Sequence, residues 1–133
     1  MAVPRYFTKE EAEKLLAQIR PLMEEAQRRT MVLERLQAET EAIEKRIRGN
    51  GHAGQGKRLA EKQEALRETG RGIAALVEQV QALGVEVKDL SMGLVDFRAL
   101  REGEEVYLCW RVGESGIEWW HTLDGGFSGR KPL

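Results

Sequence analysis

The sequence predicts an α+β protein, mostly helical, in which a long antiparallel helical hairpin with coiled-coil-like spacing carries a small C-terminal antiparallel β unit. Heptad-spaced apolar residues run through residues 8–83 and are interrupted by a glycine-rich loop at 49–56. Six of the eight aromatic residues lie beyond residue 96, in short segments that are typical of strands. We therefore expect a single domain over residues 1–133, with a β-rich part at 85–133.

A capping signal marks the start of the first helix. Thr8 and Glu11 have the spacing of a capping box, in which the threonine hydroxyl accepts from the Glu11 amide and the glutamate reaches back to the Thr8 amide. Tyr6 and Phe7, just before the cap, are placed to pack against the first turns. We expect this helix to run for about 40 residues, or roughly 60 Å.

Two rows of mainly apolar residues, each with a spacing of seven, follow the first helix and predict a partner helix. Arg29 occupies a core-row position halfway along. Pro21 removes one backbone hydrogen bond, so we expect a kink there or two helices in series. The two rows are Leu15, Leu22, Arg29, Leu36 and Ile43, and Ile19, Ala26, Leu33, Thr40 and Ile47.

The second helix is predicted from Lys57 to Leu83, with Gly84 as a left-handed cap. Gly70 and Gly72 weaken its middle, and we expect them to permit a close approach of the two helices. Its heptad positions are Leu59, Leu66, Ile73 and Val80.

The C-terminal part is predicted to be a β unit that covers the open end of the hairpin. The second helix is shorter than the first, so the first turns with Leu15, Leu16 and Ile19 overhang and need another partner. A glycine-rich tail at 125–130 predicts no regular element. Strands are predicted at 85–87, 94–97, 106–112 and 117–123, and the last two form a hairpin through residues 113–116.

Composition limits the classes of function. The chain has 21 basic and 22 acidic residues and a net charge of −1, which argues against a nucleic-acid or anionic-membrane surface. The single Cys109 excludes an intramolecular disulfide, and no apolar run is long enough to cross a bilayer. These features predict a cytoplasmic protein with no membrane partner.

Five segments, in order along the chain, resemble a bacterial family of uncharacterised proteins, domain-of-unknown-function family 2203. The resemblance covers nearly the whole chain and implies no established activity. The segments are Arg5-Tyr6-Phe7-Thr8 with Glu11-Ala12, Gly49-Asn50-Gly51-His52, Gly93-Leu94-Val95-Asp96-Phe97, Val106-Tyr107-Leu108-Cys109-Trp110-Arg111, and Trp120-His121 through Gly126-Phe127-Ser128-Gly129-Arg130.

The loop has one sequence match to a chemical motif. Gly51 to Lys57 has the spacing of a phosphate-binding loop, but Arg58 replaces the hydroxyl residue that would hold magnesium, and a helix precedes the loop instead of a strand. We interpret the loop as a hairpin tip whose glycines permit positive φ. A weaker interpretation is an anion held by the first amides of the second helix.

His52 and His121 are the two histidines and the candidate metal ligands. Neither has a second His or Cys at a ligand spacing. The structural alternative for His121 is a half-buried ring against tryptophan that donates to a backbone carbonyl. On a strand, His121 would share its face with Ile117 and Trp119, and Glu118 would point the other way.

Arg111, Asp124 and Arg130 lie near the aromatic residues and are candidates for anion binding, with His52 and His121 completing the ligand-binding set. Their structural alternative is a set of surface or interface ion pairs. Cys109 alternates with apolar neighbours and is interpreted as an inert packed thiol. Trp119 and Trp120 are interpreted as core or interface residues.

The preferred function is that of a non-enzymatic, self-associating coiled-coil protein, a homodimer that acts as a scaffold or binds a partner. The alternative is a protein that binds a metal, an anion or a small molecule, hydrolases included, at a site around His121, Asp124 and Arg130. A divalent metal is the cofactor that the histidines would imply. In an antiparallel dimer, the tip with His52 of one subunit would reach His121 and Asp124 of the other.

Overall fold

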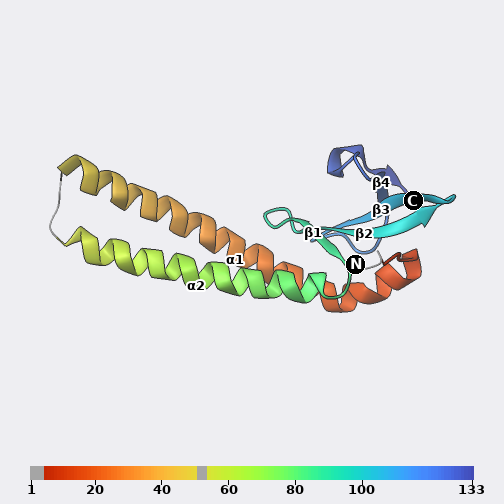
Figure 1. The fold of residues 1–133 in the computed structure, drawn as a ribbon, viewed down its shortest axis with the longest axis horizontal. Helices are drawn as coiled ribbons and strands as arrows, with labels where there is room; N and C mark the ends of the chain where they lie inside the picture. Colours follow the sequence, from red (N-terminus) through yellow and green to blue (C-terminus); the bar gives the residue numbers. More distant parts are fainter. Residues whose placement is uncertain (1–4, 51–53) are drawn as a thin grey trace.

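The computed structural model describes residues 5–50 and 54–133 and confirms the predicted fold class. Two long helices pack into an antiparallel hairpin, and a five-stranded antiparallel sheet packs at the end opposite the tip (Figure 1). The helices are α1 (Lys9–Asn50) and α2 (Gln55–Gln81). The strands are β1 (Glu86–Asp89), β2 (Leu94–Arg101), β3 (Glu104–Arg111), β4 (Trp119–Thr122) and β5 (Lys131–Pro132).

The capping box at the start of α1 is confirmed. The Thr8 amide donates to Glu11 Oε1 at 2.9 Å, and the Glu11 amide donates to Thr8 Oγ1 at 3.1 Å. The helix is continuous through Pro21, so two helices in series are excluded. Figure 1 shows α1 changing direction between its red first turns and its orange middle part, the region that contains Pro21. The missing amide of proline explains a bend at this place.

The hairpin follows the predicted heptads. On α2, Ile73 and Val80 are buried, and Gly84 adopts the left-handed conformation expected of a cap, at φ 89°. Arg29 faces α2 at Gly72, in line with its core-row position, but its charged end reaches the rim, where the side chain is 45% exposed and donates to Glu25 Oε1 at 2.9 Å. A guanidinium is too costly to bury without a partner, so it swings to a carboxylate one turn away.

The sheet has the strand order β1-β2-β3-β4-β5, with each strand antiparallel to the next. The predicted β3–β4 hairpin is confirmed, with Cys109 opposite Trp119 and Tyr107 opposite His121. Strand β2 is longer than the predicted 94–97 and pairs with β3 along its whole length, from Leu94 opposite Arg111 to Arg101 opposite Glu104. The polar and charged residues at its end concealed this extension.

One face of the sheet packs on the overhanging turns of α1, as predicted. Ala12, Leu16, Ile19 and Met23 join Val95, Phe97, Leu108, Trp110 and Ile117 in the main core. Phe7 fixes the entry to α1, because its amide donates to the Arg98 carbonyl at 2.8 Å and its ring meets Phe97 edge-on at 5.4 Å. Ile117 was expected on the His121 face, but it precedes β4 and belongs to this core.

The tail contains more regular structure than its glycines predicted. A 3-10 turn, η1 (Phe127–Gly129), lies within it, and the two-residue β5 directly after it pairs with β4 through Trp119 opposite Pro132 and Trp120 opposite Lys131. Pairing with an existing strand edge supplies order that local propensity lacks. None of the helices in the described part of the chain is long and apolar enough to span a membrane.

The two glycines of α2 provide a matched test of the hairpin packing. A Cβ at Gly70 would meet nothing within 4 Å, whereas one at Gly72 would lie 2.6 Å from Arg29 Nη1, so the expected close helix approach is wrong at Gly70. Gly70→Ala should raise the free energy of unfolding by about 1 kcal/mol through helix propensity alone. Gly72→Ala should raise it less, because Arg29 must move. Urea unfolding checks both, and an equal gain would show that Arg29 does not occupy that space.

Candidate functional site

The other face of the sheet carries a buried polar cluster. Because side chains alternate along strands, Asp96 of β2, Cys109 of β3 and His121 of β4 point away from the helical layer. Asp96 and Cys109 face each other directly in the β2–β3 register. All three side chains are buried, with exposed fractions of 3%, 0% and 2% in that order. The cluster is the main concentration of buried polar chemistry in the described residues.

The hydrogen bonds of His121 determine its protonation. Nδ1 lies 2.7 Å from the Thr122 carbonyl oxygen, which can only accept, so Nδ1 carries a proton. Nε2 lies 3.1 Å from both Asp96 carboxylate oxygens. Nε2 and an ionised carboxylate cannot face each other as two acceptors, so a proton lies between them. The predicted donation to a backbone carbonyl is present, but the ring is fully buried, and its centre lies 5.4 Å from that of the Tyr107 ring.

Two effects act in opposite directions on the pKa of the Asp96 carboxyl. Burial raises the pKa of this carboxyl, and the His121 ring beside it acts in the opposite direction, with a net pKa above the ordinary value. The Cys109 thiol beside this carboxylate also acts to lower its pKa. Asp96 therefore lies between His121, to which it is hydrogen-bonded, and the Cys109 thiol.

Cys109 is a poor nucleophile in this setting. Burial, followed by the nearby Asp96 carboxylate, raises the pKa of the thiol from 9.0 to about 12. In a cysteine–histidine catalytic pair the histidine takes the thiol proton, but here both nitrogens of His121 are engaged elsewhere. The geometry therefore supports the predicted inert thiol and offers no activated nucleophile at this position.

Arg130 closes one side of the cluster. Its Nη2 donates to Glu114 Oε1 at 2.7 Å and lies 3.4 Å from the Cys109 carbonyl oxygen. The guanidinium lies over the rings of Trp119 and Phe127, 5.0 and 4.8 Å from their centres. Its Nε is buried and has no hydrogen-bond partner in the described part of the chain. Arg130 is thus a packed, paired residue, in line with the predicted ion-pair alternative.

The structure separates the other predicted ligand residues. Asp124 is exposed and accepts from Thr122 Oγ1 at 3.1 Å, so the carboxylate beside His121 is that of Asp96. Arg111 is exposed, 5.8 Å from the centre of the Phe127 ring. His52 lies outside the described residues, and a site that it shares with His121 stays a prediction.

Sequence reasoning missed Asp96 as a partner of His121. Their separation of 25 positions along the chain hides the contact, which arises only from the pairing of β2 with β3 and of β3 with β4. One signal was present: a single acidic residue interrupts the apolar segment Leu94 to Phe97. A charge in such a run is almost never buried without a partner.

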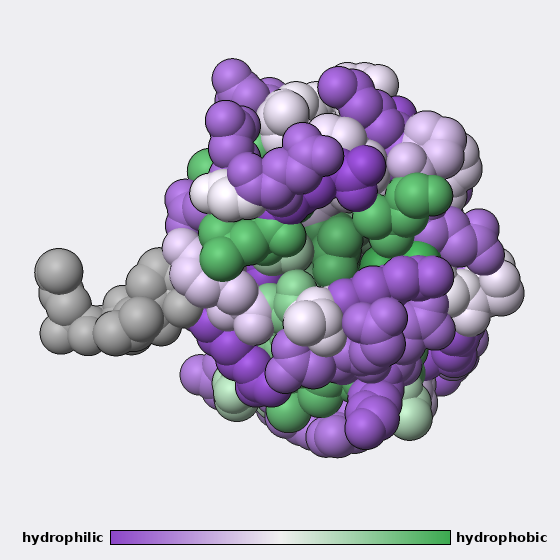
Figure 2. All heavy atoms as spheres, turned by 90° about the vertical axis from the view of Figure 1, so that its right-hand side faces the viewer, coloured by the Kyte–Doolittle hydropathy of each residue, from purple (hydrophilic) through white to green (hydrophobic). Residues whose placement is uncertain are grey.

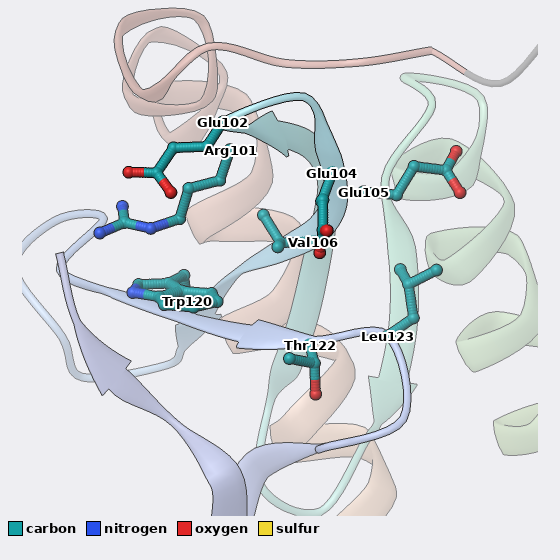
Figure 3. A pocket seen from close by; sticks show the side chains of 8 residues that line it. All are labelled: Arg101, Glu102, Glu104, Glu105, Val106, Trp120, Thr122 and Leu123. Atoms are coloured by element: carbon teal, nitrogen blue, oxygen red, sulfur yellow. The ribbon is translucent and has the colours of Figure 1, made fainter.

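A shallow hollow with a mixed apolar and charged lining opens at the far end of the sheet, the end that faces the viewer in Figure 2. It measures about 440 Å³ and is lined by Val106, Trp120, Leu123 and the charged β2–β3 turn. Figure 3 shows Arg101 reaching over Trp120, 4.5 Å from the ring centre, while Glu105 points away. Lys131 lies 5.1 Å from the same ring centre. Cations of the chain therefore already lie against the Trp120 ring, which argues against base stacking here.

These features define a class of protein: a mostly helical α+β chain whose hairpin carries an antiparallel sheet with a buried aspartate–histidine–cysteine cluster. The chain belongs to the family described as uncharacterized conserved protein (DUF2203), whose model matches residues 5–133. No curated protein and no solved structure shows a significant match. Family membership therefore supplies no activity, and the function must be argued from the geometry.

Asp96, which sequence reasoning missed, and Asp124, which it chose, provide a test of the cluster. Asp96→Ala removes one partner of a buried pair and should lower the free energy of unfolding by about 3 kcal/mol or more. Asp124→Ala removes an exposed carboxylate and should change it by about 0.5 kcal/mol at most. Urea unfolding followed by circular dichroism measures both. Similar losses for the two variants would contradict the pairing of Asp96 with His121.

The raised pKa of the Cys109 thiol leads to a second prediction. At pH 8 a thiol with a pKa of about 12 contains about a thousandfold less thiolate than one with the ordinary value of 9.0. In chelator-treated protein, Cys109 should therefore react at least about a thousandfold more slowly with an alkylating reagent than it does in urea. Mass spectrometry of timed samples gives the two rates. Rapid labelling of the folded protein would show that the thiol is neither buried nor protonated.

Proposed function

We propose that the protein is a non-enzymatic scaffold that forms an antiparallel homodimer through the distal part of its helical hairpin. The supporting observation is the incomplete burial of the apolar seam between α1 and α2 beyond the sheet. This distal part comprises residues 31–50 of α1 and 54–76 around the start and middle of α2. Within it, the apolar residues other than Ile43 and Ile73 stay half-buried or exposed. The half-buried ones include Leu33, Leu36 and Ile47 of α1 and Leu59, Leu66 and Leu76 of α2.

Half-buried leucines favour an additional layer of helix. Full burial of one such side chain stabilises a structure by about 1.5–3 kcal/mol, and a two-helix layer realises only part of this. Met31 and Val32 are 61% and 41% exposed and extend the apolar surface. A four-helix bundle made from two hairpins would cover these positions. Leu16 and Met23 do not contribute, because the sheet already buries them.

The charge distribution favours a second copy in the antiparallel orientation. Residues 44–58 carry five basic side chains and a single acidic one, whereas the whole chain has a net charge of −1, so the remainder is acidic. A parallel dimer would place two basic tips together. An antiparallel dimer places each tip over the acidic remainder of its partner. The basic residues are Lys45, Arg46, Arg48, Lys57 and Arg58.

The same proposal places the protein in the cytoplasm. In support, its single cysteine is a buried free thiol, and the described residues contain no disulfide that would need an oxidising compartment. A protein partner would bind the surface that the dimer leaves exposed.

Light scattering tests the dimer. The wild-type protein should have twice the chain mass of 15.1 kDa at micromolar concentration, and less at high salt, since screening weakens the charge pairing. The double variant Met31→Glu/Val32→Glu should shift the protein to a monomer with unchanged helix content. The matched control Leu100→Glu alters an equally exposed leucine at the sheet end and should remain a dimer.

A cysteine introduced at the tip determines the orientation. In an antiparallel dimer Lys57→Cys residues lie at opposite ends and should form no intermolecular disulfide on mild oxidation. The buried Cys109 does not interfere. A monomeric wild type would refute self-association, and an efficient disulfide at position 57 would refute the antiparallel arrangement.

A further inference from the structure

We propose that Asp96, Cys109 and His121 form a binding site for a divalent transition metal ion, with zinc as the ion that fits best. One carboxylate oxygen, the Cys109 Sγ and one ring nitrogen lie within 4.8 Å of one another. Carboxylate, thiolate and imidazole are the ligand types that zinc combines in proteins. The inference concerns the sheet alone and is independent of the proposed dimer.

His121 is already oriented as a ligand. A histidine that binds a metal almost always donates its other ring N–H to a carbonyl or carboxylate, which fixes the tautomer. The Thr122 carbonyl does this for Nδ1 at 2.7 Å, so Nε2 is the nitrogen directed at Asp96. The hydrogen bond that orients a metal-binding histidine is therefore already made by His121.

Metal binding would leave the charge of this buried site unchanged. Without metal, the Asp96–His121 pair holds one shared proton and Cys109 holds another, so the cluster is neutral. A divalent ion that displaces both protons meets one carboxylate, one thiolate and one neutral imidazole, which again sum to zero. No uncompensated charge is buried in either state, so the usual obstacle to a charge in an apolar interior is absent.

The distances require only a small rearrangement. A tetrahedral zinc ion holds its ligand atoms roughly 3.3–3.8 Å apart, and the Nε2–carboxylate distance is already 3.1 Å. The widest separation in the cluster, at most 4.8 Å, must shrink by about 1 Å. Two cations act on the cluster, and each is paired with a carboxylate that offsets its repulsion of an ion: Arg130 with Glu114 at 2.7 Å, and Lys88 with Glu86 at 2.9 Å.

A thiolate ligand selects the kind of metal. Thiolates bind zinc and other borderline or soft ions, whereas magnesium and calcium prefer oxygen ligands alone. Zinc should therefore bind, and magnesium should not compete even in large excess. Iron or cobalt would occupy the same ligands with lower affinity.

The experiment uses the full chain without an affinity tag, stripped by a chelator and titrated with zinc against a competing dye. The wild type should bind one ion per chain and release about two protons per ion in weakly buffered solution. Cobalt, used as a spectroscopic substitute, should give a thiolate-to-metal charge-transfer absorption. This signal reports Cys109 ligation in the unaltered protein, so it does not depend on whether any variant folds.

Variants assign the ligands. Asp96→Asn, Cys109→Ser and His121→Gln should each lower zinc affinity at least about tenfold, and Cys109→Ser should abolish the charge-transfer absorption. Asp124→Asn and His52→Ala are the matched controls and should bind as the wild type does. The proposal is overturned if the wild type binds no zinc, if cobalt gives no thiolate absorption, or if only His52→Ala weakens binding.

Discussion

The structure depends on one constraint: a single proton must lie between Asp96 and His121. Both side chains are buried on the outer face of the sheet, the face that points away from the helices. The Thr122 carbonyl takes the Nδ1 proton of His121, so Nε2 and the carboxylate would otherwise face each other as two acceptors. A slip of one residue in β2 would turn Asp96 into the apolar core and place Phe97 among the buried polar side chains of the outer face. The pair therefore fixes the register of the central strands, and it does so from the side opposite the helices.

The two faces of the sheet perform different tasks. The inner face is apolar and joins the first turns of α1 into one core, with Trp110 and Phe97 fully buried. The outer face holds the polar cluster under Arg130 and its aromatic neighbours. The hairpin beyond the sheet has a thinner core, so it should open at lower free energy than the sheet. Dimerisation through the hairpin would therefore stabilise the part of the molecule that has the lower free energy of opening.

Local signals were sufficient to predict most of the fold. The capping box at Thr8, the heptads of α2 and the left-handed Gly84 all act over a few residues and could be identified from the sequence. The site could not be predicted in the same way, because Asp96 and His121 meet only through two strand registers. Asp124 was chosen because it is near His121 in sequence, but it lies beyond the end of β4, exposed. The order of the tail was missed for a related reason, since β5 is stabilised by its pairing with β4 and not by its own residues.

The measurement that tests the central constraint most directly is the protonation of the His121 ring in metal-free protein, read from long-range proton–nitrogen correlations. The account predicts that Nδ1 carries a slowly exchanging proton, because it donates to the Thr122 carbonyl inside the folded sheet. A bare Nδ1 with the only ring proton on Nε2 would contradict it. In that case the orientation of the ring, the shared proton and the neutral exchange of protons for metal would all be wrong.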